Sequence, residues 1–237
     1  SMATFVLVHG GWQGGWSWRL LAPLLRAAGH EVFVPTLTGL GERSHLAGMA
    51  INLDTHIADV ANTILWEDLQ DVILVGHSYG GMVVTGVADR LAERIGRLVY
   101  LDAVVPQDGS TLFTLRPEYL EAFMDAAGTG AGLMVMPRAA SAFDTRPEFW
   151  DWLNARRTPH PLACFAQKIA LTGAHRNVAS RLYIYAQGGI CDGMYDAYRG
   201  DPAARVVMVA DTGHGVMIDQ PEEVARILLE GLGQKAP

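Results

Sequence analysis

The segment Gly76-His77-Ser78-Tyr79-Gly80-Gly81 constrains the fold most strongly, because it directly follows the apolar run 71–75. The pattern predicts a strand, a G-x-S-x-G turn and a helix. A sharp strand-to-helix turn lifts the serine side chain clear of a sheet, and it needs small residues at positions 76 and 80 so that the backbone packs closely. The N-terminus of the following helix favours negative charge near the serine. We therefore expect Ser78 to be a nucleophile.

Strand and helix patterns alternate along most of the remaining chain. The expected strands are residues 5–8, 31–35, 71–75, 97–101, 182–186 and 205–209, and the expected helices are residues 18–28, 53–69, 79–92 and 221–229. Apolar strands between amphipathic helices predict an α/β fold, with a mostly parallel sheet covered by helices on both faces.

Residues 106–177 interrupt this alternation. They contain helical patterns but no convincing central strand, so we expect an inserted helical lid over the site, with residues 2–105 and 178–237 forming the core. The expected substrate contacts are the large side chain next to the first glycines and four residues of the lid, namely Trp12, Phe113, Met134, Trp152 and His160.

Composition narrows the possible partners. Half of the 237 residues are hydrophobic, which is enough for one substantial core. The net charge of −7 gives no electrostatic attraction to nucleic acid or to an anionic membrane, and no stretch reaches membrane-spanning length. The isolated cysteines at 164 and 191 are typical of reduced thiols, so we expect a cytoplasmic protein.

An activated serine needs a base, and His214 is the best candidate. It lies in the segment 211–215, just after the last expected strand, where the loop reaches the same edge of the sheet as Ser78. Glycines on both sides of His214 give the ring freedom to point inward.

The base needs an acid to orient it, and the chain order serine, aspartate, histidine favours an aspartate after the penultimate strand. Asp192 follows the strand 182–186 and is the preferred residue. Asp196 is a nearby alternative, and Asp102, at the end of the preceding strand, is a second one.

A tetrahedral oxyanion requires converging backbone N–H groups. We expect these donors at Tyr79, after the nucleophile, and at Gly11, in the loop after the first strand, with Gly10 or Trp12 as alternatives. The loop does not fit the G-x-G-x-x-G dinucleotide pattern, and the sequence shows no metal-ligand spacing. No cofactor or metal is therefore expected.

The chain resembles the α/β-hydrolase superfamily from end to end. The opening segment 5–18, the serine turn and the closing segment 211–214 resemble plant methyl esterases, hydroxynitrile lyases and small bacterial esterases. The resemblance implies Ser78, Asp192 and His214 as a triad, with Gly11 and Tyr79 as oxyanion donors.

Two positions separate the esterases from the lyases in this branch. The lyases carry a hydroxyl residue where Gly10 stands and a lysine where Gly215 stands, and this sequence has neither. We therefore expect hydrolysis of a small hydrophobic ester through an acyl-enzyme. A cyanohydrin or carbon–carbon lyase and a non-catalytic ligand-binding protein are the alternatives.

Overall fold

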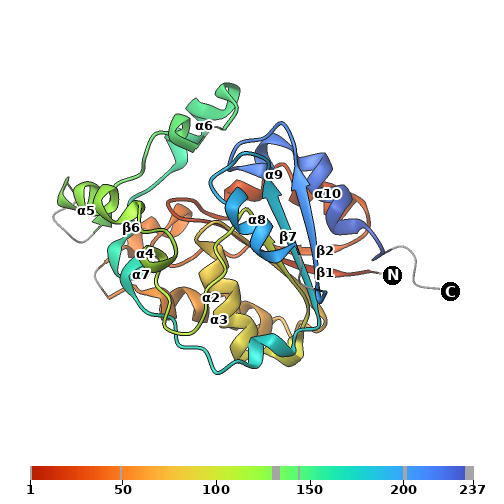
Figure 1. Cartoon of the computed structure of the whole chain (residues 1–237). Coiled ribbons are helices and arrows are strands. Elements are labelled where there is room, and N and C mark those ends of the chain that lie inside the picture. Colours follow the sequence, from red (N-terminus) through yellow and green to blue (C-terminus); the bar gives the residue numbers. More distant parts are fainter. Residues whose placement is uncertain (1, 49, 130–133, 144, 200–201, 233–237) are drawn as a thin grey trace.

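The computed structural model describes residues 2–48, 50–129, 134–143, 145–199 and 202–232. Six parallel strands form the central sheet, in the order β2-β1-β3-β4-β7-β8 (Figure 1). The strands are β1 (Thr4–Val8), β2 (Glu31–Phe33), β3 (Val72–His77), β4 (Ile95–Leu101), β7 (Ser180–Ala186) and β8 (Ala204–Val209). The predicted parallel sheet is confirmed, and each predicted strand corresponds to one of these six.

Both faces of the sheet are buried, which explains the nearly continuous apolar runs in its strands. In β1, Val6 and Val8 enter the core on one face, while Phe5 and Leu7 enter the core on the other. The period of two that places side chains on alternate faces thus supplies both cores from one short strand.

Helices cover each face. α1 (Ala22–Ala27), α9 (Val216–Asp219) and α10 (Pro221–Leu229) pack on the Phe5 side, and α2 (Leu53–Trp66), α3 (Gly80–Arg90) and α8 (Asp192–Tyr198) pack on the Val6 side. Short 3-10 segments connect them: η1 (Gly15–Trp18), η2 (Gly41–Leu46), η3 (Ala92–Arg94), η4 (Ala140–Phe143), η5 (Pro147–Phe149) and η6 (Ala174–Asn177). The helix expected over residues 18–28 is shorter than predicted, because Pro23 lies in the first turn of α1 and favours a start there.

The chain between β4 and β7 adds no strand to the central sheet among the described residues. It contains α4 (Leu112–Leu115), α5 (Tyr119–Thr129), α6 (Trp150–Arg156) and α7 (Leu162–Ala166). Figure 1 shows α5 and α6 standing away from the sheet. The sequence pattern did not predict the antiparallel ribbon of β5 (Met134–Val135) and β6 (His160–Pro161) in this segment. That residues 106–177 act as a lid stays a prediction.

Strand register brings three loops together at one edge of the sheet. Val8 pairs with Gly76, and His77 pairs with Leu101, so β1, β3 and β4 end side by side. The loops that follow parallel strands meet at the carboxyl edge, which is where open α/β sheets bind ligands.

Composition also led to expectations about membranes and thiols. The described residues include no helix that combines the length and hydropathy needed to cross a membrane. Cys164 and Cys191 are both buried free thiols, in agreement with the reading of isolated cysteines.

Candidate active site

Ser78 occupies the turn between β3 and α3 with a φ of 56°. This left-handed conformation is strained for a residue with a side chain, and such strain is concentrated at functional sites. The turn depends on its glycines, as predicted. A Cβ at Gly76 would lie 2.7 Å from the Gly80 carbonyl oxygen, and a Cβ at Gly80 would lie 2.8 Å from the Val8 carbonyl oxygen.

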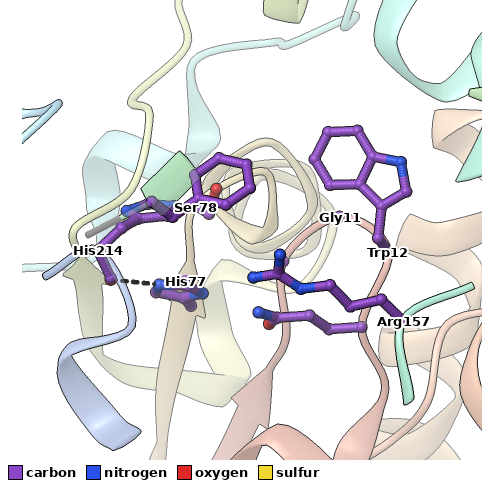
Figure 2. A pocket seen from close by; sticks show the side chains of 9 residues that line it. Gly11, Trp12, His77, Ser78, Arg157 and His214 are labelled. Carbon is purple, nitrogen blue, oxygen red and sulfur yellow. Dashed lines mark hydrogen bonds between the residues drawn. The ribbon is translucent and has the colours of Figure 1, made fainter. Parts of the chain in front are cut away.

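His214 lies beside Ser78 (Figure 2). The two residues line the same two cavities. Nδ1 of His214 is 2.5 Å from Oδ2 of Asp102, which is fully buried. The second carboxylate oxygen of Asp102 accepts a hydrogen bond from the Ala186 N–H at 3.1 Å. An imidazole held at Nδ1 by a carboxylate presents Nε2 as a base, which is the arrangement that activates a serine hydroxyl.

Asp192, the preferred acid, makes no hydrogen bond or ion pair with His214 among the described residues, and Asp102 holds that position instead. Asp192 begins α8, six residues after the end of β7, and its Oδ2 accepts a hydrogen bond from the Gly188 N–H at 3.1 Å. Asp102, the second alternative, follows β4 directly and therefore lies next to Ser78 at the sheet edge. The side chain of Asp196, the other alternative, is outside the described part of the chain.

The loop that carries His214 is held in place from several directions. The His214 N–H donates to the Phe143 carbonyl at 3.0 Å, and its carbonyl accepts a hydrogen bond from Nε2 of His77 at 2.9 Å. Because a carbonyl only accepts, His77 carries its proton on Nε2 and leaves Nδ1 as a bare acceptor. Burial holds the pKa of His77 well below its usual value, so this ring is neutral.

The glycine loop after β1 is strained at Trp12, whose φ is 62°. Residues of the 106–177 segment hold both of its backbone groups: the Thr158 N–H donates to the Trp12 carbonyl at 3.0 Å, and Nδ1 of His160 accepts from the Trp12 N–H at 3.2 Å. The Trp12 N–H is therefore occupied and is not a free oxyanion donor. Gly11 lines both cavities, and Tyr79 lines one of them, so these two residues remain the predicted donors.

Two cavities of different character meet at the nucleophile. They share Gly11, Trp12, Ser78, Phe143 and His214. The larger one, about 30 Å³, is mainly apolar; its other lining residues are Tyr79, Asp102, Val104, Leu112, Arg116, Tyr119, Phe123, Phe165, Ile190 and Cys191. The smaller one, about 20 Å³, has the more polar lining of the two (the polar cavity) and is completed by Gly10, Gln13, His77 and Arg157.

Of the five predicted substrate contacts, only Trp12 lines either cavity. Phe113 packs behind the apolar cavity against Phe123, with ring centroids 5.8 Å apart. Trp152 packs on Trp16 at 5.2 Å, away from the site. Both side chains take part in packing within or against the 106–177 segment. A periodic apolar pattern in the sequence does not distinguish core residues from residues that line a cavity.

Met134 and His160 belong to the β5–β6 ribbon, and neither residue lines either cavity. Met134 pairs with Pro161 in the β5–β6 ribbon. His160 is fully buried and stacks on Phe165 at 4.2 Å beneath the Trp12 loop, which makes it a support for that loop.

Sequence reasoning missed two polar residues of the smaller cavity, Gln13 and Arg157. Gln13 lies within the glycine loop that carries the expected oxyanion donor Gly11, so its place in that loop is a usable sequence signal. Arg157 directly follows Arg156, the last residue of α6. Nothing in the local sequence pattern distinguishes these two arginines. Figure 2 shows Arg157 extending toward Ser78 and His77.

One buried group contains three residues whose ligand atoms lie within 4.8 Å of each other: His56, His160 and Cys164. Nε2 of His56 is 2.9 Å from the Thr38 carbonyl, so it must carry a proton and has no lone pair for a metal. Burial raises the pKa of Cys164 to about 12, so it is a thiol in this structure. The group therefore fits structural hydrogen bonding better than metal binding.

The sequence matches the alpha/beta hydrolase family over residues 5–227. It is 46% identical over 240 residues to a carbendazim hydrolyzing esterase from Nocardioides sp. strain SG-4G, with 96% of this chain and 98% of that protein covered. It is 32% identical to an alpha-hydroxynitrile lyase from Arabidopsis thaliana over 118 residues, or 49% of this chain and 46% of that protein. An extracellular α/β-hydrolase from a Paenibacillus species has a similar fold, with a TM-score of 0.83 at 23% identity, covering 96% of this chain and 98% of that chain.

Proposed function

Because the chain belongs to the alpha/beta hydrolase family, we propose that it is a serine esterase that cleaves carboxylic esters with a hydrophobic portion. The observation that carries this proposal is the 2.5 Å contact between His214 Nδ1 and Asp102 Oδ2 beside Ser78. Similarity to an esterase over nearly the whole chain supports the same reaction class. The apolar cavity next to Ser78 supports a hydrophobic substrate.

In this proposal, the Ser78 hydroxyl attacks the ester carbonyl while His214 Nε2 accepts its proton. The bond from the carbonyl carbon to the alkoxy oxygen then breaks, and His214 returns the proton to the leaving alcohol. Water attacks the acyl-enzyme by the same route and releases the acid. Asp102 holds the imidazole tautomer and stabilises the imidazolium that forms in each step.

The backbone N–H groups of Gly11 and Tyr79 are the proposed donors to the oxyanion. Removing one such donor costs a serine hydrolase about 3 to 4 kcal/mol of transition-state stabilisation. The Trp12 loop that carries Gly11 is held by Thr158 and His160, so the lid segment supports the proposed oxyanion site from outside.

Position 10 favours ester cleavage over cyanohydrin elimination. A Cβ at Gly10 would lie 2.9 Å from Cβ of Ser78 and 3.1 Å from the His77 carbonyl oxygen. A hydroxyl residue here, as in the lyases that the sequence resembles, would crowd the nucleophile in this backbone arrangement.

The test is hydrolysis of a panel of methyl and aryl esters of increasing acyl length by the wild type and by Ser78→Ala. We expect turnover in the wild type and loss of at least about 10³-fold in the variant, because the covalent step is removed. A fluorophosphonate probe should label the wild type and not Ser78→Ala. Full ester turnover by Ser78→Ala, or cyanide release from cyanohydrins without ester cleavage, would contradict the proposal.

A further inference from the structure

Three side chains that line the polar cavity beside Ser78 each have a buried polar atom without a hydrogen-bond partner within the described structure. These are Oε1 of Gln13, Nδ1 of His77 and Nε of Arg157. Gln13 and His77 are 5% and 1% exposed, so solvent does not satisfy them freely. Buried polar atoms without partners are uncommon in native proteins, and each one calls for an explanation.

The Arg157 guanidinium is held but not neutralised. Its Nη1 donates to the Arg138 carbonyl at 3.1 Å, and the group lies over the Phe143 ring at 5.0 Å. No carboxylate among the described residues lies within salt-bridge distance of it. A partly buried cation without an acidic partner still offers a strong, charge-assisted donor to a ligand.

The three atoms define a specific hydrogen-bonding pattern. Arg157 Nε–H is a donor, while His77 Nδ1 and Gln13 Oε1 are acceptors. A carboxylate only accepts, so it would face the lone pairs of both acceptors. A hydroxyl group both accepts and donates, and it therefore matches the cavity.

The size of the cavity fits the same group. Its volume of about 20 Å³ exceeds the roughly 10–15 Å³ that one water requires. A hydroxyl attached to a substrate occupies similar space, while the apolar lining of the neighbouring cavity suits an apolar substituent.

The two cavities meet at Ser78 and His214, so one substrate carbon next to the reacting carbonyl can direct a different group into each. We infer that the polar cavity is a subsite for the 2-hydroxyl group of 2-hydroxy esters, with Arg157 Nε–H donating to the hydroxyl oxygen and the hydroxyl proton directed to His77 or Gln13. The apolar substituent on the same carbon then lies among Phe123, Phe143 and Phe165. This assignment rests on the proposed esterase function.

Methyl mandelate and methyl phenylacetate form a matched substrate pair, because they differ only in the 2-hydroxyl group. The wild type should show a higher kcat/KM for one enantiomer of methyl mandelate than for methyl phenylacetate. In Arg157→Met and in Gln13→Met, that ratio should fall about tenfold, as expected for one hydrogen bond, charge-assisted in the case of Arg157.

Arg138→Met is the control, because it removes a cation from the same lid segment and from the same Phe143 ring, 5.7 Å away, without lining either cavity. The ratio should be unchanged in this variant. Arg157→Gln provides a second substitution if Arg157→Met fails to fold, and fluorophosphonate labelling of Ser78 verifies that each variant retains its site.

Equal losses for both substrates in the Arg157 and Gln13 variants would overturn the assignment, because a structural role or a bound water would affect both esters alike. A wild type that hydrolyses both esters with no preference and no enantioselectivity would also overturn it while leaving the esterase proposal intact. A wild type that neither reacts with the probe nor cleaves either ester would remove the proposed function and the subsite together.

Discussion

Substituting Asp102 by asparagine tests the catalytic arrangement most directly. In the wild type, the two carboxylate oxygens accept from two different donors, the Ala186 N–H at 3.1 Å and His214 Nδ1 at 2.5 Å. Asparagine has one acceptor oxygen. If this oxygen keeps the Ala186 bond, the amide NH₂ faces Nδ1 and forces the imidazole proton onto Nε2, where it removes the lone pair that Ser78 needs.

The expected loss in kcat for Asp102→Asn is about 10³- to 10⁴-fold, or about 4 to 5.5 kcal/mol, as for a triad with the wrong histidine tautomer. The assay is steady-state hydrolysis of an aryl ester at neutral pH, with urea denaturation to verify that the variant is folded.

Asp192→Asn is the matched control. An asparagine oxygen at position 192 can still accept from the Gly188 N–H, as the carboxylate does at 3.1 Å. A surface change of this kind should alter kcat by no more than about twofold. A large loss in Asp192→Asn together with near-normal activity in Asp102→Asn would refute the assignment of Asp102 as the acid.

Three further outcomes are expected. Gly10→Ala places a methyl group 2.9 Å from Cβ of the nucleophile, so ester turnover should drop more than about tenfold and urea denaturation should show a loss of about 1 to 3 kcal/mol. His160→Phe leaves the Trp12 N–H without its acceptor, so it should lower kcat and should lower the free energy of unfolding by about 1 to 3 kcal/mol. His160→Asn supplies an amide oxygen as an acceptor and should recover part of both losses. Equal effects of the two variants would argue against this hydrogen bond. Burial lowers the pKa of His9 and of His56 to about 4, below the ordinary 6.5, so the unfolded state binds more protons between these values. Because burial also lowers the pKa of His77 and of His160, the free energy of unfolding should fall by at least about 4 kcal/mol from pH 7 to pH 5; a flat denaturation profile over that range would contradict this.

Much of the fold could be predicted because its causes are local. The alternation of apolar strands and amphipathic helices specifies a covered parallel sheet, and the glycines around Ser78 specify the turn that exposes it. Helix bounds were predicted less well where local signals compete. A helix was expected over residues 18–28, but α1 begins only at Ala22, with a proline in its first turn.

The serine turn and the histidine loop were found in the sequence because each carries its own signature of glycines at the end of a strand. The acid has no such local signature, because an aspartate after either β4 or β7 satisfies the same chain order. Strand register places Asp102, the proposed acid, beside Ser78: His77 pairs with Leu101, so the residues that follow them lie side by side. Arg157 likewise reaches Ser78 only because a segment 79 positions further along the chain folds over the sheet edge. Local patterns report what the backbone does over a few residues, whereas contacts between distant residues depend on how whole strands align and pack.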